Sequence, residues 1–350
     1  MGHRKDLGIV RVGVLTGGGD VPGLNPAIRA VVMRLLDYGH EPVGLPRGWL
    51  GLMEGLTEPL TLESVEEIVS RGGTILGSSR TNPLKRDEDL DKCLDNIKAL
   101  GLDAVVAIGG EDTLSVASNL HKLGVNTVGV PKTMDNDLSE TDYTLGFDTA
   151  VNIAMDAVDR LRDTAKSHDR AIVLEVMGRH AGWVALYTGV AGGADWILIP
   201  EVAPDLDEMC DHLVRARNRG KRYAIVVASE GIDLPQAEEE SVSVDAFGHV
   251  ILRERGVGDF LAREIESRAG LETRSAALGH IQRGGPPTMF DRVLGTMLGL
   301  KAADMVNAGE FGKMSAIRGN QIVAVDMERA VSGLKTVPIE LYEEAKSLFK

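Results

Sequence analysis

The sequence is poor in aromatic residues and in positive charge. Only 4% of its 350 residues are aromatic, and its formal net charge is −14. A surface that stacks nucleic-acid bases needs aromatic side chains, and one that binds phosphodiester backbones or anionic membranes needs positive charge. We therefore expect no nucleic-acid partner and no membrane partner. A small anionic substrate remains possible, provided that arginines gather locally to bind it.

Cysteine and long apolar runs are also scarce. The two cysteines, Cys93 and Cys210, are too few for a disulfide framework, and each falls in a segment typical of a helix. No apolar run reaches the length of a membrane span, and the opening residues MGHRKDLG lack the apolar core of a signal peptide. These absences predict a cytoplasmic protein.

Apolar strand-like segments alternate with amphipathic helical segments along the whole chain. Strands are expected at 9–15, 104–108, 125–130, 171–176, 224–228 and 321–325, and helices at 26–38, 90–100, 148–163, 258–268 and 290–307. Such alternation predicts an α/β fold with mainly parallel sheets. The length suggests two domains or two lobes, and a hydrophobic content of 43% is enough for their cores.

A run of three glycines lies between the first predicted strand and the first predicted helix. We expect Asn25 to be the N-cap of that helix and Pro26 its first residue. A glycine loop before a helix N-terminus presents backbone N–H groups to an anion, which makes Gly18 and Gly19 candidate phosphate ligands. A plain tight turn would use the same residues, although three adjacent glycines favour phosphate. The spacing differs from the GxGxxG dinucleotide fingerprint.

Two further segments carry candidate ligands for an anion or a metal. The stretch 71–82 has too many small residues for a helix, and Arg80 in it could contact phosphate. After the strand at 104–108, two glycines precede Glu111 and Asp112 at the start of a helix. The helix dipole alone would favour these carboxylates, but glycines also let a ligand approach, so Glu111 is a candidate metal ligand.

The stretch PKTMDND, residues 131–137, follows a buried strand and combines several kinds of chemistry. Asp135 and Asp137 are separated by one residue, with Lys132 and Thr133 just before them. At a strand end, this set could bind a metal, accept a proton and bind an anion. The same residue types also occur in solvated acidic turns, so the pattern alone leaves both interpretations open.

Six motifs together resemble the phosphofructokinase family over nearly the whole chain. They are, in order, GGGDVPGLN, GGTILGSSR, GGEDT, PKTMDND, MGRHAG and LGHIQRGG. The resemblance implies two Rossmann-like three-layer lobes with the active site in the cleft between them. A donor lobe would comprise 9–146 plus about 282–333, and a sugar-phosphate lobe 147–281 plus about 334–350.

The resemblance also implies a reaction and roles for individual residues. The reaction is Mg²⁺-dependent phosphoryl transfer to the 1-hydroxyl of fructose 6-phosphate, with Asp135 as the base and Thr133, Asp137 and Arg179 as catalytic neighbours. Glu111 would be the magnesium-linked acid, which is usually Asp in the family. The implied substrate-binding residues are Thr133, Met134, Asp135, Arg170, Met177, Gly178, Arg179, Glu230, Arg274, His280, Ile281, Gln282 and Arg283. Arg170 and Arg274 come from a neighbouring subunit in the family, which implies a homodimer or homotetramer.

The phosphoryl donor depends on two positions. In the resembling ATP-dependent enzymes the position of Asp112 is typically Gly, whereas the diphosphate-dependent enzymes have Asp there, usually with Lys at the position of Lys132. A carboxylate at Asp112 adds bulk and negative charge where a nucleotide phosphate would pass. We therefore expect diphosphate as donor, with ATP as the alternative. A non-catalytic regulatory subunit and a related NAD or lipid kinase are rival interpretations, which the carboxylates and the motifs MGRHAG and LGHIQRGG disfavour.

Overall fold

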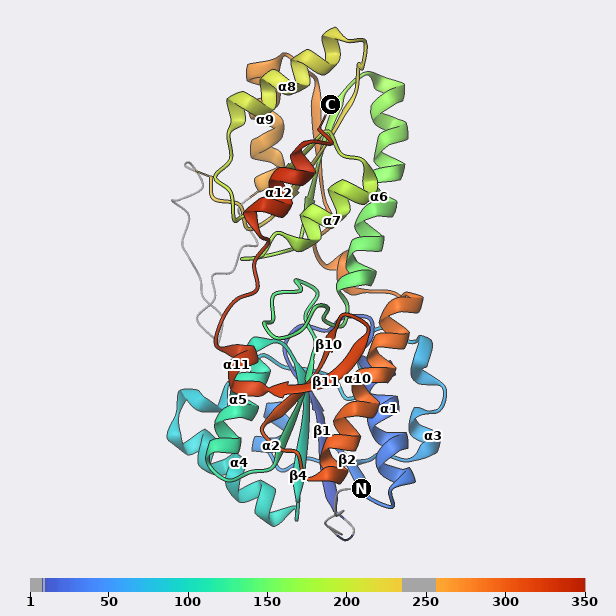
Figure 1. The fold of residues 1–350 in the computed structure, drawn as a ribbon, viewed down its shortest axis with the longest axis vertical. Coiled ribbons are helices and arrows are strands. Elements are labelled where there is room, and N and C mark those ends of the chain that lie inside the picture. Colours follow the sequence, from blue (N-terminus) through green and yellow to red (C-terminus); the bar gives the residue numbers. More distant parts are fainter. Residues whose placement is uncertain (1–7, 9, 235–255, 350) are drawn as a thin grey trace.

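The computed structural model describes residue 8 and residues 10–234 and 256–349, which form two α/β lobes (Figure 1). Each lobe contains its own sheet, with seven strands in the first and four in the second. The predicted α/β class with mainly parallel sheets is therefore confirmed. Residues 9 and 350, the outer limits of the predicted lobes, lie outside the described residues.

The first lobe is built on a sheet with the order β11-β10-β5-β4-β1-β2-β3. Its strands are β1 (Arg11–Thr16), β2 (Glu41–Gly44), β3 (Glu58–Pro59), β4 (Ala104–Gly109), β5 (Thr127–Pro131), β10 (Lys313–Arg318) and β11 (Gln321–Asp326). All neighbours pair in parallel except the two edge strands, β3 and β11. β4 and β5 are buried along their whole length because helices cover both faces, which explains their uninterrupted apolar sequence.

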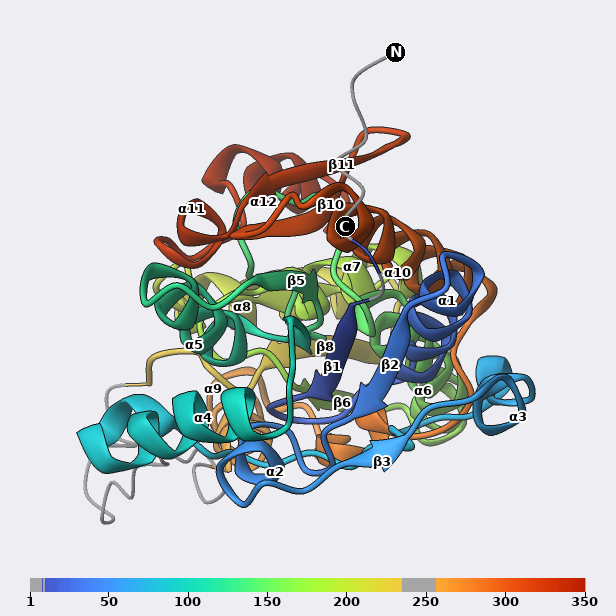
Figure 2. The same ribbon diagram turned by 90° about the horizontal axis from the view of Figure 1, so that it is seen from below.

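Helices pack on both faces of this sheet and make the lobe three-layered (Figure 2). One face carries α1 (Leu24–Asp37), α3 (Leu62–Val65), the 3-10 turn η1 (Ile68–Ser70) and α10 (Met289–Ala308). The other carries α2 (Trp49–Met53), the 3-10 turn η2 (Pro83–Lys85), α4 (Asp87–Ala99), α5 (Glu111–Lys122) and α11 (Met327–Val331). α1 and α10 lie so close that a Cβ at Gly299 would be 2.6 Å from the carbonyl oxygen of Ala27.

The second lobe has a fully parallel sheet with the order β7-β8-β6-β9. Its strands are β6 (Ala171–Val176), β7 (Trp196–Leu198), β8 (Ala224–Ser229) and β9 (Thr273–Ala277), and its helices are α6 (Phe147–His168), α7 (Trp183–Gly192), α8 (Leu206–Asn218), α9 (Val257–Ala269) and α12 (Ile339–Lys346). One hydrophobic core joins these elements, and it includes Tyr342 of α12, whose hydroxyl donates to the carbonyl oxygen of Ile197 at 2.9 Å.

Within the described residues, the chain passes between the lobes three times. α6 leads from the first sheet to the second, the 3-10 turn η3 (Gly279–Arg283) leads back to α10, and the segment after α11 crosses again to α12 (Figure 1). Each lobe is thus assembled from segments that are distant in sequence. The residue boundaries predicted for the two lobes remain a prediction.

Two expectations about the first lobe need correction. Asn25 is not the N-cap of α1, because the helix begins at Leu24 with Gly23 as its N-cap. The Asn25 side chain instead binds the loop at 71–75: its Oδ1 accepts from the backbone N–H of Ile75, and its Nδ2 donates to the carbonyl of Arg71. The hairpin partner of β11, strand β10, was not expected from the sequence.

The two cysteines lie in helices, as predicted, with Cys93 in α4 and Cys210 in α8, and both are buried. Among the helices of the described residues, none has the length and apolar character to cross a membrane.

Candidate active site

Three adjacent strands bring the polar motifs of the first lobe to one edge of its sheet. β1 pairs with β4 and β4 with β5, all in parallel, with Thr16 beside Ile108 and Gly109 beside Pro131. β2 lies on the other side of β1, so the strand order reverses at β1 and β4. Open α/β sheets bind ligands at such a switch point, outside the carboxyl ends of the strands.

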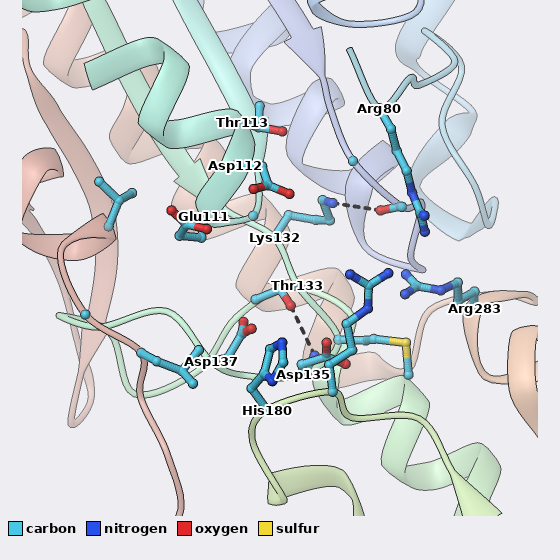
Figure 3. A pocket seen from close by; sticks show the side chains of 18 of the residues that line it. Arg80, Glu111, Asp112, Thr113, Lys132, Thr133, Asp135, Asp137, His180 and Arg283 are labelled. Atoms are coloured by element: carbon cyan, nitrogen blue, oxygen red, sulfur yellow. Dashed lines mark hydrogen bonds between the residues drawn. The ribbon is translucent and has the colours of Figure 1, made fainter. Parts of the chain in front are cut away.

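A cavity of about 370 Å³ lies at this edge, where the second lobe faces it (Figure 3). The lining residues are Gly18, Gly19, Arg80, Gly110, Glu111, Asp112, Thr113, Lys132, Thr133, Met134, Asp135, Asp137, Arg179, His180, Arg283, Val331, Ser332, Gly333 and Leu334. Twelve of the site residues predicted from the sequence thus line one cavity. They include all the residues predicted to bind the phosphoryl donor or the metal.

The glycine loop after β1 forms one wall of the cavity. Gly18 has a φ of 78°, in the left-handed region that favours glycine. Its N–H donates to the carbonyl of Ser79 at 3.2 Å, and the Ser78 hydroxyl donates to the Gly18 carbonyl at 2.5 Å. These bonds attach the glycine loop to the segment that carries Arg80.

Lys132 crosses from the end of β5 to the glycine loop. Its Nζ donates to the carbonyl oxygen of Gly19 at 2.7 Å, and the residue is only 3% exposed. Burial and the nearby charge of Arg283 lower the pKa of Lys132 to about 7. Arg283 approaches the same loop: a Cβ at Gly19 would lie 2.5 Å from its Nη1. Two cationic side chains therefore meet where the sequence predicts an anion.

Thr113 packs between the glycine turns that follow β1 and β4. A Cβ at Gly17 would lie 2.4 Å from the Thr113 Oγ1, and one at Gly109 would lie 2.3 Å from its Cβ. Both glycines therefore lack a side chain so that the first turn of α5 can pack closely against them. We did not predict Thr113 as a site residue, although the motif GGEDT contains it.

Asp135 and Asp137 approach the cavity from a tight turn after β5. Asn136 between them has a φ of 53°, a left-handed conformation that Asn adopts more readily than most residues. It is buried, and its Oδ1 accepts from the backbone N–H of Thr144 at 3.0 Å. The Asp135 N–H donates to the Thr133 Oγ1 at 3.2 Å, whereas the Asp135 Oδ1 is buried without a hydrogen-bond partner in the described part of the chain.

Negative charge accumulates on this side of the cavity. Burial raises the pKa of Asp137, and the charges of Asp135 and Glu111 raise it further. Burial, with a contribution from Asp135, raises the pKa of Glu230 to about 7. Concentrated carboxylates of this kind favour a bound proton or a cation.

Glu111 and Asp112 begin α5 at the rim of the cavity. The Glu111 Oε1 accepts from the Ser115 hydroxyl at 3.0 Å. No group of three or more His, Cys, Asp or Glu side chains that could bind a metal occurs in residues 10–234 and 256–349. Mg²⁺ does not need such a group, since it is usually bound by one or two carboxylates, substrate phosphates and water. The exposed Glu111 carboxylate, beside other acidic groups, has the chemistry of such a ligand.

Four residues predicted to bind substrate lie next to the cavity without lining it. The N–H of Gly178 donates to the Glu230 Oε1 at 3.5 Å, and the N–H of Met177 donates to the Gln282 Oε1 at 2.8 Å. Gln282 is fully buried, and its Nε2 donates to the carbonyl of Ala150. Gln282 thus braces the Met177 segment from behind, and substrate contact by these four residues stays a prediction.

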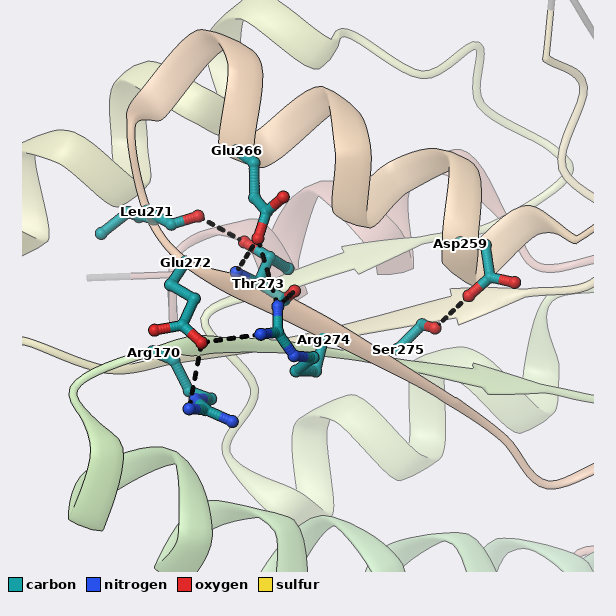
Figure 4. A network of polar contacts seen from close by, with 8 residues as sticks. All are labelled: Arg170, Asp259, Glu266, Leu271, Glu272, Thr273, Arg274 and Ser275. Carbon is teal, nitrogen blue, oxygen red and sulfur yellow. Dashed lines mark hydrogen bonds and ion pairs between the residues drawn. The ribbon is translucent and has the colours of Figure 1, made fainter.

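Arg170 and Arg274 lie on the second lobe in a separate cluster (Figure 4). Both guanidinium groups approach the Glu272 Oε1, at 3.0 Å for Arg170 and 2.8 Å for Arg274. The predicted sugar-pocket residues His280 and Ile281 are exposed, with Ile281 67% accessible. Within one chain these four residues do not line the cavity, and their predicted contact with a sugar phosphate stays a prediction.

Besides Thr113, two further parts of the cavity wall were not predicted from the sequence. His180 lies beside Asp135 and Asp137 in Figure 3, within the motif MGRHAG, where its chemistry could have been noticed. The segment 331–334, which comprises the last residue of α11 and the three residues after it, closes another side. It has no glycine-rich or charged pattern, and its position depends on the third crossing between the lobes.

Comparison with known proteins supports a shared ancestry over nearly the full length. Residues 11–306 match the phosphofructokinase family. A pyrophosphate–fructose 6-phosphate 1-phosphotransferase from Dictyoglomus thermophilum is 56% identical over 344 residues, which cover 97% of this chain and 99% of that protein. ATP-dependent 6-phosphofructokinase 3 from Streptomyces coelicolor is 48% identical over 341 residues, which cover 96% and 99% respectively.

A solved structure has the same fold. The pyrophosphate-dependent phosphofructokinase from Nitrosospira multiformis superimposes with a TM-score of 0.81, covering 97% of this chain and 92% of that one. The two sequences are 20% identical, so this likeness concerns the two-lobed architecture alone.

Proposed function

Because the chain belongs to the phosphofructokinase family, we propose that it transfers a phosphoryl group from inorganic diphosphate to the 1-hydroxyl of fructose 6-phosphate. The products are fructose 1,6-bisphosphate and phosphate, and the reaction runs in both directions. The observation that carries this proposal is the cavity itself, where Lys132 and Arg283 face the carboxylates of Asp135 and Asp137.

Asp135 is the base in this proposal. Its Oδ1 is buried beside the cavity and lacks a partner among the described residues, while the backbone of the same residue is fixed by the Thr133 hydroxyl. A carboxylate so placed can accept the proton of the 1-hydroxyl as that oxygen bonds to phosphorus. Asp137 and Thr133 complete the turn and keep this carboxylate directed at the substrate.

Cationic side chains hold the phosphates in this proposal. Lys132 and the backbone of Gly18 and Gly19 bind the diphosphate, and Arg80 and Arg179 approach it from the loop after η1 and from the second lobe. Positioning and charge neutralisation of this kind account for most catalysis of phosphoryl transfer, which has little covalent chemistry for the protein to perform.

The donor is diphosphate because of Asp112. The Asp112 carboxylate lines the cavity close to the glycine loop and Lys132, where a nucleotide would have to pass with a further phosphate. The sequence identities support diphosphate as the phosphoryl donor. This chain is 56% identical to the relative named as a pyrophosphate-dependent enzyme and 48% identical to the relative named as ATP-dependent.

Mg²⁺ is the proposed cofactor, with Glu111 as its protein ligand. One carboxylate at the rim of the cavity suits an ion that keeps most of its coordination for phosphate oxygens and water. When bound, Mg²⁺ supplies neutralisation of phosphate charge, and removal of the ion with a chelator should abolish turnover.

The sugar phosphate is bound between subunits in this proposal. Arg170 and Arg274 do not line the cavity of their own chain, yet guanidinium groups suit a phosphate because their donors match its oxygens. An exposed apolar stripe on α10, formed by Met289, Val293 and Met297, supports a homodimer or homotetramer, because such stripes are commonly covered by another chain.

The test is an assay of purified protein with fructose 6-phosphate and Mg²⁺, given diphosphate or ATP in turn. We expect fructose 1,6-bisphosphate with diphosphate and little with ATP. Asp135→Asn should lower turnover by about two orders of magnitude or more, with the Michaelis constant for the sugar nearly unchanged, since the amide keeps the shape of the carboxylate. Near-native turnover of Asp135→Asn would remove Asp135 from the role of base.

A further inference from the structure

The segment 333–337, here called the strap, is the third crossing between the lobes and is bonded to both. Its first residues pair with the loop that follows Asp137. The Ser139 hydroxyl donates to the carbonyl of Gly333 at 2.7 Å, and Leu334 forms a β-bridge with Leu138. The strap is therefore hydrogen-bonded to the residues that directly follow the turn with the two cavity aspartates.

Lys335 makes the densest set of contacts in the strap. Its backbone N–H donates to the carbonyl of Asp137 at 2.8 Å, and its Nζ donates to the carbonyls of Thr141 and Asp142, both at 2.9 Å. The Asp142 carbonyl also accepts from the Asn136 Nδ2 at 3.2 Å. One lysine thus bonds the Asp137 end of the Asp135–Asp137 turn and the loop at 141–142, and it shares an acceptor with Asn136, the residue between the two aspartates.

The other side of the strap is bonded to the second lobe. The Trp183 Nε1 donates to the carbonyl of Lys335 at 2.9 Å, and the Lys335 ammonium lies 5.5 Å from the centroid of that indole ring. The N–H of Val337 donates to the Glu201 Oε1 at 2.8 Å, and the same carboxylate accepts from the N–H of Gly182. Gly182, three residues after Arg179, is the N-cap of α7, and Trp183 is the first residue of that helix.

Both halves of the cavity are therefore attached to the same short segment. Asp135 and Asp137 belong to the first lobe, whereas Arg179 and His180 belong to the second. Lys335 itself does not line the cavity, so it acts through the residues that it contacts. An interaction that fixes reacting groups can change a rate strongly, because small displacements of those groups weaken catalysis.

We propose that Lys335 is a positioning residue for phosphoryl transfer, which fixes the Asp135–Asp137 turn against the Arg179 segment. The inference rests on the proposed function, since it assigns a role in that reaction. It assigns no substrate contact to Lys335, so the ammonium should affect the chemical step more than it affects binding of fructose 6-phosphate.

The test compares Lys335→Met with a matched control, Lys346→Met. Methionine keeps the backbone hydrogen bonds and much of the apolar stem but removes the ammonium. Lys346 also lies 5.5 Å from a tryptophan ring, that of Trp196, and pairs with Glu208, but it is on α12 away from the cavity. Both variants therefore lose a cation–π contact with a tryptophan, and only Lys335→Met also loses the hydrogen bonds to the loop at 141–142.

We expect Lys335→Met to lower kcat about tenfold or more, with the Michaelis constant for fructose 6-phosphate within about threefold of wild type. Lys335→Arg should recover part of kcat, because a guanidinium can donate to the same two carbonyls. Thermal unfolding of each variant is followed in parallel. A Lys335→Met enzyme that melts earlier but keeps the kcat of Lys346→Met would overturn the inference and leave a structural role.

The two proposals fail in different ways. A wild-type protein that makes no fructose 1,6-bisphosphate with either donor overturns the proposed function, and the role of Lys335 with it. An active wild type together with an unchanged kcat in Lys335→Met overturns the role of Lys335 alone.

Discussion

At the scale of the residue, Lys132 is a buried cation whose charge is easily changed. Burial and Arg283 lower its pKa to about 7. Bound diphosphate would raise that pKa again, because an adjacent anion favours the protonated form. The charge of Lys132 near neutral pH therefore depends on whether the donor is present.

This charge predicts a pH dependence of donor binding. Lys132 loses its proton as the pH rises through its pKa, so kcat/KM for diphosphate should fall between about pH 6 and pH 8, whereas kcat should change less. Initial rates at a series of pH values measure both constants. In Lys132→Arg the guanidinium stays protonated, so the fall in kcat/KM that is caused by Lys132 should be absent.

The ionisation of diphosphate itself is the same for both proteins and cancels in the comparison. Coincident profiles for wild type and Lys132→Arg would show that Lys132 does not control donor binding by its charge.

Much of the site could be predicted residue by residue because its motifs are local. Each of the segments 16–20, 109–113 and 131–137 follows a strand, and neighbouring parallel strands bring their carboxyl ends together. The role of Lys335 could not be predicted, because its partners at 137–142 are almost two hundred residues away in the chain. The buried position of Gln282 is likewise decided by packing between α6, the end of β6 and η3.

At the scale of the element, α6 begins with a cap supplied by a different helix. The Asp291 carboxylate, on α10, accepts from the backbone N–H groups of Gly146 and Thr149 at 2.9 and 2.8 Å and from the Thr149 hydroxyl. Asp291 is fully buried, and burial raises its pKa to about 6. Above that pH the carboxylate is ionised, which suits the positive end of the helix dipole.

Asp291→Asn should therefore lower the free energy of unfolding at pH 8 by about 1–3 kcal/mol, because the amide leaves buried donors unpaired. Urea unfolding followed by circular dichroism measures the change. Asp156→Asn is the control, since Asp156 lies on α6, the helix that Asp291 caps, but is exposed and paired with Arg160. Equal stability of the two variants would mean that the cap contributes little.

Helices and strands with regular patterns could be predicted, whereas those defined by tertiary contacts could not. β6 occurs over the predicted residues 171–176, because an apolar run bounded by polar residues is typical of a buried strand. β10 was missed, although it pairs with β11 along its whole length. The N-cap of α1 was placed wrongly at Asn25, because the side chain of Asn25 binds the loop at 71–75 instead of its own helix.

At the scale of the whole molecule, the proposal places the complete active site between two chains. Arg170 and Arg274 form a cluster with Glu272 on the second lobe, and neither arginine lines the cavity of its own chain. If these arginines complete a neighbouring site, defects in different subunits should compensate each other.

Co-expression of Asp135→Asn with Arg274→Ala tests this arrangement. A mixed pair of subunits has one site with both defects and one site with neither. Roughly a quarter of all sites should then be intact after random association in symmetric pairs. Activity is measured at a fructose 6-phosphate concentration where each variant alone is nearly inactive. Activity equal to the average of the separate variants would place each complete site within one chain.

The measurement that tests the central claim most directly is the ratio of kcat/KM for diphosphate to kcat/KM for ATP. Wild type, Asp112→Gly and Asp112→Asn are compared with fructose 6-phosphate and Mg²⁺. Wild type should strongly favour diphosphate. Asp112→Gly should gain about tenfold or more with ATP, since it removes both bulk and charge, and each 1.4 kcal/mol corresponds to about tenfold in rate. Asp112→Asn should gain less, because it keeps the bulk. A wild-type enzyme that favours ATP would contradict the account.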